Sequence, residues 1–597
     1  MNKEYLVEDR LADFSTDRRV VILSAIAICI GAFGALIAYA LMWLITAISN
    51  FAFFQTYAPT MLSPSGHHLG LWVILMPVVG GLVIGLMARY GSEKIRGHGI
   101  PEALEAILVG RSRIEAKVAV LKPVSSAISI GTGGPFGAEG PIIMTGGAFG
   151  SLFAQFFHLS SAERKTLLVA GAAAGMSAIF ATPIAAVLLA VELLLFEWKP
   201  RSFIPVALAS AAAASLRIPL MGAGPIFPMD PHPALPYNVL LLAGLVGIIA
   251  GLLSGLLTSL VYAFEDIFQR LPIHWMWWPA IGGLFVGIGG WIDPRVLGVG
   301  YDLIHSILRG EIIGASLLGL LIGKSLVWSL SLGSGTSGGV LAPLLIMGGA
   351  LGAFEAHWIP VGDAGLWALL SMAATMGGTM RSPFTAIVFT LELTHDLNAL
   401  PALLIACIAS EIVTVLLLRR SILTEKVARH GHHIVREYSV DPLELRRVNE
   451  VMDLEVPTVP LGMKVSALAK EISKPQSPLG RHQALPIVDT NGMLAGIITK
   501  GDVLRSLGES KIESMSVEEV GTKNLIVTYP DDTVSSAVIK MLKNDIGRLL
   551  VVDPENPRKL LGYLGRPNII EARLQRLEEE HSREQGWMKN LPILGQD

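Results

Sequence analysis

Long apolar runs, separated by short polar or glycine-rich segments, occupy the chain up to about residue 418. A helix needs about 20 mostly apolar residues to cross the hydrocarbon layer of a bilayer. Runs of that order lie at 20–49, 71–90, 237–264, 275–291, 314–332 and 400–418. The pattern predicts a short N-terminal segment over residues 1–19 and an all-α polytopic membrane domain over residues 20–428.

The charges that flank this domain predict its orientation. Arg18 and Arg19 precede the first apolar run, and Arg419 and Arg420 follow the last one. Segments rich in Lys and Arg remain on the cytoplasmic side of a membrane. We therefore expect a multi-pass protein of the cell membrane, in contact with the lipid bilayer and with both termini in the cytoplasm.

Beyond the last apolar run, short apolar segments alternate with charged ones. Residues 446–506 and 515–576 share one order of elements: a β-branched segment, a helix, a strand that ends in aspartate, and a further strand. The aspartates are Asp489 and Asp553. This pattern is typical of small α/β modules. It predicts two copies of one cytoplasmic module, followed by a C-terminal tail over residues 577–597.

The membrane part contains an internal repeat. Residues 183–193 read PIAAVLLAVEL and residues 383–393 read PFTAIVFTLEL, an offset of 200 positions (383 − 183). Upstream, residues 140–148 read GPIIMTGGA and residues 342–350 read APLLIMGGA, an offset of 202 (342 − 140). Duplicated halves in transporters commonly form a substrate site near the bilayer midplane, where broken helices meet. The repeat therefore predicts such a site.

Three glycine- and proline-rich breaks mark the candidate pathway. They read GHGIP at 97–101, GAEGP at 137–141 and GGVLAP at 338–343, each followed by an apolar run. Glycine before proline and an apolar run is typical of a helix N-terminus. The first N–H groups of a helix are unpaired and carry about half a positive charge. Converging N-termini can therefore hold an anion that has lost its water.

In these breaks the chain closely resembles the CLC family of chloride channels and transporters, whose pore-lining loops read GxGIP, GxEGP and GxFxP. The resemblance extends to Lys122 and to the GSGTSGG segment at 333–339. It implies about 18 membrane helices in inverted repeats, a homodimer with one pore per subunit, and transport of chloride or another small anion. The anion-binding positions that it implies are Gly97, His98, Gly99, Ile100, Pro101, Gly137, Ala138, Gly140, Pro141, Gly339, Val340, Leu341 and Leu423.

Glu139 is the candidate gate. An ionisable group flanked by glycines inside a membrane domain is energetically expensive unless it has a function. In the family, the carboxylate at the matching position occupies the anion site when it is charged and moves away when it is protonated. The alternative is a structural glutamate, satisfied by the helix N-termini around it.

Three positions in the pathway depart from the familiar family pattern. His98 replaces a serine whose hydroxyl helps to coordinate the anion, so either its neutral ring donates one N–H or only its backbone serves. Leu423 replaces a tyrosine, so it can narrow the passage without donating a hydrogen bond. Leu341 replaces phenylalanine and leaves the backbone amides available. Chloride preference therefore rests on the resemblance and not on these side chains.

The position after Glu192 bears on mechanism. Well-known proton-coupled relatives carry a second internal glutamate there, and this chain has Leu193. Leucine cannot relay a proton, so the residue favours channel-like conduction. The alternative is an H⁺/Cl⁻ antiporter in which Glu139 is the proton-linked gate. Glu192 and its repeat counterpart Glu392 are expected to be structural acids bonded to neighbouring helix termini.

The cytoplasmic modules resemble paired CBS domains. In the first copy, the GIITKGD segment at 496–502 matches the ribose-binding strand and helix start of that family, with Thr499 and Asp502 as tentative adenine-nucleotide ligands. The second copy has Asn568 in place of the acid. The alternatives are that Asp502 only complements the helix dipole and that the pair supports dimer assembly. No cofactor is required.

Other functional classes fit the sequence less well. A net charge of −3 gives no footprint for nucleic acid. No metal site and no enzyme are expected, because HExxH and paired-cysteine motifs are missing from the sequence and its GxSxG match at 335–339 has no strand before it. A CBS-regulated cation transporter is a further alternative. Against it, the membrane part lacks the clustered acids that a divalent cation needs.

Overall fold

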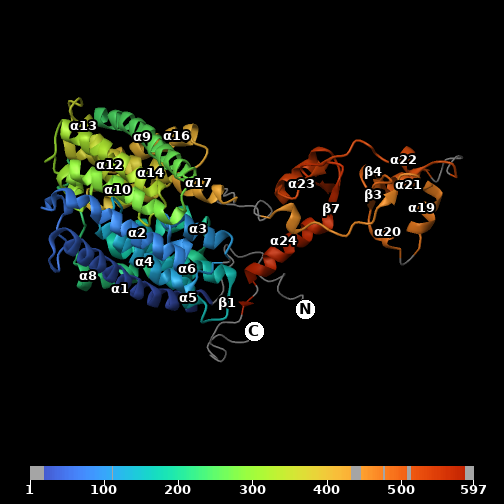
Figure 1. Cartoon of the computed structure of the whole chain (residues 1–597), viewed down its shortest axis with the longest axis horizontal. Helices are drawn as coiled ribbons and strands as arrows, with labels where there is room; N and C mark the ends of the chain where they lie inside the picture. The colour runs from blue at the N-terminus through green and yellow to red at the C-terminus, as the bar shows by residue number, and fades with distance from the viewer. Residues whose placement is uncertain are drawn as a thin grey trace. The chain divides into compact units, whose positions relative to one another are not determined.

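The computed structural model describes residues 19–110, 112–431, 446–474, 477–506, 513–581 and 583–584. The chain divides into two compact units, and each is described by itself: residues 1–438 with 583–597, and residues 439–582. Figure 1 shows both units. The predicted N-terminal segment lies outside the described residues, apart from Arg19.

The first unit is helical, as the apolar pattern predicts. Its first half contains α1 (Arg19–Phe54), α2 (Leu75–Tyr90), α3 (Ile100–Leu108), α4 (Ala116–Gly131), α5 (Glu139–Ala154), α6 (Ser161–Phe180), α7 (Pro183–Leu189) and α8 (Pro200–Met221). Its second half contains α9 (Tyr237–Gln269), α10 (Trp278–Ile292), α11 (Tyr301–Leu308), α12 (Ala315–Gly333), α13 (Leu341–Glu355), α14 (Ala364–Met380), α15 (Pro383–Thr394) and α16 (Leu400–Leu417), after which comes α17 (Ile422–Arg429). The all-α membrane fold is confirmed.

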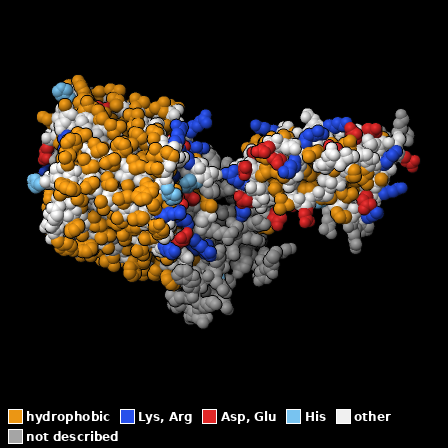
Figure 2. Space-filling model, in the orientation of Figure 1, with side chains coloured by type: hydrophobic (Ala, Val, Ile, Leu, Met, Phe, Trp, Pro, Cys, Tyr) orange, Lys and Arg blue, Asp and Glu red, His pale blue; other side chains and the backbone are white. Residues whose placement is uncertain are grey.

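The lengths and surface of these helices suit a bilayer. Within the described residues, six helices are long and apolar enough to cross a membrane: Arg19–Phe54, Gly70–Tyr90, Pro200–Met221, Tyr237–Gln269, Ala315–Gly333 and Leu397–Arg429. Figure 2 shows a face of this unit covered almost entirely by hydrophobic side chains, with charged side chains gathered along one edge. An apolar exterior of this kind is compatible with lipid and not with water.

The two halves of the unit repeat one order of elements, and equivalent lysines make equivalent contacts. Lys122 Nζ donates to the carbonyls of Ile95 at 2.8 Å and Gly97 at 2.7 Å. Lys324, 202 positions later (324 − 122), donates to Val296 at 2.9 Å and Gly298 at 3.1 Å. Each fully buried ammonium thus satisfies the carbonyls of the loop before a short helix. The repeat therefore extends from α1–α8 to α9–α16.

Small residues allow the central helices to approach closely. A Cβ on Gly146 of α5 would lie 2.2 Å from the carbonyl oxygen of Gly171 on α6, and one on Gly171 would lie 2.1 Å from that of Gly146. Almost every residue of α5, α6, α13 and α14 is buried. Since lipid provides no hydrophobic drive between membrane helices, this close packing holds the core together.

The second unit contains two copies of one α/β arrangement. The first has β2 (Val459–Pro460), α19 (Val465–Ile472), α20 (Pro478–Arg481), β3 (Ala484–Val488), β4 (Leu494–Thr499) and α21 (Lys500–Ser506); the second has α22 (Val517–Val520), β5 (Val527–Thr528), α23 (Val534–Lys543), β6 (Arg548–Val552), β7 (Leu560–Gly565) and α24 (Arg566–His581). Each sheet joins a parallel strand pair to an antiparallel one, in the orders β2-β3-β4 and β5-β6-β7. The predicted duplication is confirmed.

Candidate functional site

The three predicted breaks meet at the centre of the helical unit. The loop at Gly97 pairs with Ser337, and Gly137 pairs with Gly339. Gly97 N donates to Thr336 O at 3.0 Å, and Gly339 N donates to Gly137 O at 3.0 Å. The N-termini of α3, α5 and α13 therefore converge. All the predicted anion-binding residues from the three breaks are buried there: Gly97, His98, Gly99, Ile100, Pro101, Gly137, Ala138, Gly140, Pro141, Gly339, Val340 and Leu341.

The approach of two of these N-termini depends on glycine. Gly99 has φ 93°, and a Cβ there would lie 2.4 Å from the carbonyl oxygen of Gly140. A Cβ on Gly140 would lie 1.9 Å from the carbonyl oxygen of His98. Any side chain at either position would force α3 and α5 apart, and only glycine adopts this φ without strain. The glycines of the GxGIP and GxEGP motifs therefore allow the two loops to pack directly against each other.

Glu139 places its carboxylate at the N-terminus of α13. Oε1 accepts a hydrogen bond from the backbone N–H of Leu341. The residue is fully buried, and Oε2 has no hydrogen-bond partner among the described residues. A Cβ on Gly137 would lie 1.8 Å from Oε2, and one on Gly339 would lie 2.4 Å from Oε1. The flanking glycines thus leave just enough room for an anionic group at this helix N-terminus.

His98 lies beside a largely buried cluster of charged side chains that the motifs of the sequence do not predict. The residue is 3% exposed, and its Nδ1 has no partner within the described part of the chain. Glu102, three residues later, accepts from Gly99 N at 2.7 Å and forms an ion pair with Lys426 of α17. Lys122 also interacts electrostatically with this group. Two lysines and one glutamate leave an excess of positive charge beside the three helix starts.

A capping signal identifies one member of this cluster in the sequence. Glu102 is the third residue of α3 and accepts from the amide of the N-cap, Gly99. Acids at that position are typical of helix starts. Lys426 gives no comparable signal, because its partner lies 324 positions away.

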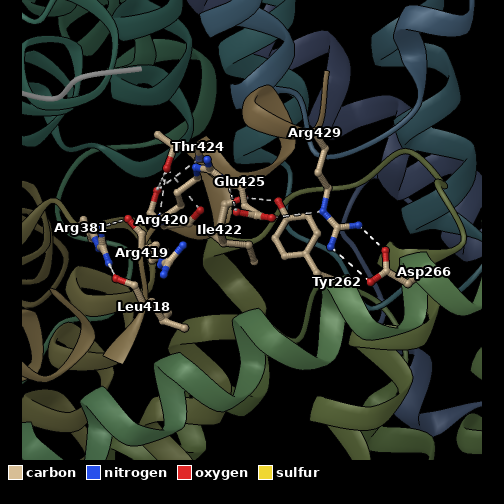
Figure 3. A network of polar contacts seen from close by, with 11 residues as sticks. Tyr262, Asp266, Arg381, Leu418, Arg419, Arg420, Ile422, Thr424, Glu425 and Arg429 are labelled. Carbon is tan, nitrogen blue, oxygen red and sulfur yellow. Dashed lines mark hydrogen bonds and ion pairs between the residues drawn. The ribbon is translucent and has the colours of Figure 1, made fainter. Parts of the chain in front are cut away.

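Polar contacts with α9 hold the helix α17, which carries Leu423, in place. The hydroxyl of Tyr262, on α9, donates to the carbonyl of Ile422 at 2.5 Å, and Arg429 bonds to Asp266. Figure 3 shows both contacts. The guanidinium of Arg429 also lies 4.7 Å from the centre of the Tyr262 ring. Leu423 itself is fully buried. Its side chain is therefore kept at one place in the protein interior.

The two repeat-related acids cross-link the halves of the unit, as expected. Oε2 of Glu192 accepts from the N–H of Thr385 at 2.8 Å and from its hydroxyl at 2.5 Å, at the start of α15. Glu392 accepts from the amides of Ile184 at 3.0 Å and Ala185 at 2.8 Å, at the start of α7. The prediction of acids bonded to helix termini is confirmed. Leu193 lies buried in the π-helical segment Ala190–Leu195.

In the α/β unit, Asp502 already has intramolecular partners. Its Oδ2 accepts from Thr499 N at 2.9 Å and Thr499 Oγ1 at 2.6 Å, and it pairs with Arg505. Asn568 makes the equivalent contact in the second copy, where it accepts from Gly565 N at 2.8 Å. Both residues cap a helix, so a nucleotide would have to share or displace the contacts of Asp502.

The described residues contain no group of three or more His, Cys, Asp or Glu side chains that could hold a metal ion. The polar groups at the central site are backbone amides, the carboxylate of Glu139 and nearby basic side chains.

The fold and site define a class: a membrane protein of two repeated halves, whose broken helices direct their N-termini at a buried central glutamate, followed by a duplicated α/β module. A family model described as voltage gated chloride channel matches residues 80–415, and the CBS domain model matches residues 448–509 and 517–575. Because the first match covers more than half of the chain, the protein belongs to the CLC family of voltage-gated chloride channels, with two CBS domains.

Some relatives of this chain are named exchange transporters and others are named channels. The chain is 30% identical over 370 residues to the "H(+)/Cl(-) exchange transporter ClcA" of Salmonella agona, which covers 58% of this chain and 76% of the relative. It is 29% identical over 371 residues to the "Voltage-gated ClC-type chloride channel ClcB" of Salmonella typhimurium, with coverages of 60% and 87%.

Solved structures share the fold. A slow cyanobacterial Cl⁻/H⁺ antiporter matches with a TM-score of 0.61 and 22% identity, over 70% of this chain and 99% of that one. A eukaryotic CLC transporter matches with a TM-score of 0.60 and 18% identity, over 92% of this chain and 98% of that one. At these identities the likeness concerns the fold alone.

Proposed function

We propose that this protein exchanges chloride, or another small anion, for protons across the cell membrane, with Glu139 as the gate. The observation that carries the proposal is the carboxylate of Glu139 on the amide of Leu341. A negatively charged group at a buried helix N-terminus occupies the position that a transported anion would take. The anion and the carboxylate therefore compete for one place.

Protonation of Glu139 couples the competition between the carboxylate and the anion to proton binding. A neutral carboxyl group loses most of its attraction to the α13 N-terminus, so it yields the place to an anion. When the anion leaves, the carboxyl releases its proton and returns. One cycle of the gate thus moves an anion and a proton through the same centre.

The relatives favour exchange over the channel-like conduction that Leu193 suggests. ClcA of Salmonella agona is named an H⁺/Cl⁻ exchange transporter and is 30% identical to this chain. Exchange then requires that protons reach Glu139 without an acid at position 193. Uncoupled conduction is the second candidate, because Leu193 cannot carry a proton and ClcB is named a channel.

The excess of positive charge around His98 supports the proposal that the anion passes this residue before it reaches Glu139. The ring Nδ1 of His98 has no partner among the described residues, and Lys122 and Lys426 outnumber Glu102. In this proposal an anion passes His98, Leu423 and the α3 N-terminus before it meets Glu139. Backbone amides there replace part of its hydration.

Assembly and regulation follow the family. We propose a homodimer with one pathway per subunit, both termini in the cytoplasm, and an adenine nucleotide at Thr499 and Asp502 of the CBS pair. A nucleotide ribose would take the carboxylate oxygens that Thr499 and Arg505 now engage.

The proposal is tested on purified protein in liposomes. A chloride gradient should drive proton movement in the opposite direction to net chloride flow, detected with a pH-sensitive dye. Glu139→Gln should abolish the proton movement and retain chloride flux. Chloride flux without proton movement in the wild type would instead support the channel, and the absence of chloride flux would contradict anion transport.

A further inference from the structure

The second repeat contains a counterpart of the GHGIP loop. Residues 298–301 read GVGY and open α11, as residues 97–100 read GHGI and open α3. Gly298 and Gly300 have φ of 64° and 77°, and Gly97 and Gly99 have φ of 87° and 93°. In inverted repeats, such equivalent loops approach the centre from opposite sides of the membrane. Where the first copy has an apolar isoleucine, the second has Tyr301.

The ring of Tyr301 lies in an aromatic wall. Its centre is 6.4 Å from that of Phe180 and 5.9 Å from that of Phe227, both edge to face. Phe180 in turn lies 5.1 Å from Phe389. Such contacts fix the ring and leave the hydroxyl as a polar tip in apolar surroundings.

The hydroxyl of Tyr301 is buried and meets no hydrogen-bond partner in the part of the chain that the structure describes. An unsatisfied buried hydroxyl lowers stability, so its presence calls for a reason. Phenylalanine at this position would avoid that penalty. A partner that arrives in another state of the protein is such a reason.

Glu139 is the group that can provide the partner. Its Oε2 is also buried and without a partner among the described residues. The hydroxyl of Tyr301 and the carboxylate of Glu139 are near enough to interact electrostatically. One is a donor and the other an acceptor, and α11, which begins at Tyr301, packs against α13, whose N-terminus holds the carboxylate.

We propose that Tyr301 is the positioning residue that receives the carboxyl group of Glu139 when an anion takes the place at the N-terminus of α13. This inference rests on the proposed gate role of Glu139. In the closed state the carboxylate bonds to Leu341. In the open state the protonated carboxyl bonds to the Tyr301 hydroxyl, which stabilises the open state alone.

Opening is linked to protonation, so Tyr301 sets the pH at which the protein works. If removal of the hydroxyl lowers the open-state equilibrium tenfold, the pH of half-maximal transport falls by one unit. Other titratable groups near Tyr301 are Lys324, Asp302 and His305: Lys324 bonds to the loop carbonyls, Asp302 accepts from Ser63 Oγ at 2.6 Å, and His305 packs on Phe227. Substitution of Tyr301 by phenylalanine leaves all three in place.

The experiment compares anion flux against pH for wild type, Tyr301→Phe and Tyr237→Phe in liposomes. Tyr237 is 87% exposed at the start of α9 and is the matched control. Tyr301→Phe should lower flux about fivefold to tenfold at neutral pH and move the profile to lower pH by about one unit, as expected for one lost hydrogen bond. Tyr237→Phe should match the wild type.

A second experiment, in the Glu139→Ala variant, distinguishes a positioning role of Tyr301 from a purely structural role. In Glu139→Ala no carboxyl group remains to be received, so adding Tyr301→Phe should change flux less than twofold. An equal loss in both backgrounds would overturn the inference, because it would mean a structural effect of Tyr301. If the pH profile of Tyr301→Phe is unshifted while Glu139→Gln loses its pH dependence, the role of Tyr301 is wrong and the gate role of Glu139 stands. Retained pH dependence in Glu139→Gln would overturn the gate itself.

Discussion

Glu139 and Leu341 occupy equivalent positions of the two repeats, 202 residues apart (341 − 139), and the carboxylate of the first accepts the amide of the second. Each residue begins the central helix of its half. The pseudo-symmetry thus brings two helix N-termini together, and one repeat supplies a negative group where the other supplies a positive end. Only the first repeat has a carboxylate at this position, and the proposed gate depends on that difference between the repeats.

Replacing Glu139 with glutamine should remove the pH dependence of anion flux. Glutamine has nearly the shape of the protonated acid and cannot ionise, so the gate remains in its neutral form. Chloride flux measured between pH 4.5 and 7.5 should vary less than twofold in this variant. A profile that still follows pH as the wild type does would exclude Glu139 as the proton-linked gate.

Lys426→Met should destabilise the membrane unit by about 3 kcal/mol. It removes one partner of the largely buried pair with Glu102 and leaves that carboxylate without its cation. Thermal unfolding in detergent measures the change. Arg420→Met is the matched control, since its pair with Glu425 is more exposed and should contribute at most about 1 kcal/mol. Equal shifts for the two variants would contradict this role of the buried pair.

A histidine in the loop between α8 and α9, outside the membrane-spanning segments, should make stability depend on pH. The ring of His232 lies 3.0 Å from Asp363 and 2.5 Å from Asp396. These carboxylates, Asp363 first, raise the pKa of His232 to about 9 although burial opposes them. A raised pKa means that the protonated ring contributes its full stability below its ordinary pKa, near 6.5, and loses it as the pH rises through 9.

His232→Gln tests this contribution. The melting temperature of the wild type should fall more than that of the variant between pH 6.5 and 9.5, and the two should differ most at the acidic end. Parallel curves for the two proteins across this range would show that the histidine does not hold its proton in the folded state.

Asp502→Ala should lower the stability of the CBS unit by about 1 kcal/mol, because the carboxylate caps the start of α21. If an adenine nucleotide binds there, the same change should abolish binding of ATP to the full-length protein, measured by titration calorimetry. Asn568→Ala, the equivalent change in the second copy, is the control and should retain binding. ATP binding that survives Asp502→Ala would place the nucleotide elsewhere.

Sequence alone could predict the class of fold and the central site, because both depend on local patterns. Apolar length predicts most of the crossing helices, and glycine before proline predicts the helix starts. Pro200–Met221 was missed, since Ala, Ser, Arg217 and two inner prolines dilute its apolar character. The predicted run at 275–291 corresponds to Trp275–Trp277 and α10, which are not among the six helices that could cross a membrane.

The contacts that sequence could not predict join distant parts of the chain. Lys426 meets Glu102 across 324 positions. Tyr301 and Glu139 lie in different repeats, and α11, which begins at Tyr301, packs against α13, whose N-terminus holds the Glu139 carboxylate. In each pair, no sequence motif near one residue predicts which residue it will meet. The second copy of the GxG loop could have been found by extending the repeat, since Gly298 and Gly300 lie 201 positions after Gly97 and Gly99 (298 − 97).

The measurement that tests the central claim most directly is proton movement driven by a chloride gradient in liposomes that contain wild-type protein, with the membrane potential set by potassium and valinomycin. The account predicts protons moving opposite to net chloride flow, in wild type and not in Glu139→Gln. Chloride flux with no accompanying proton movement at any potential would contradict it.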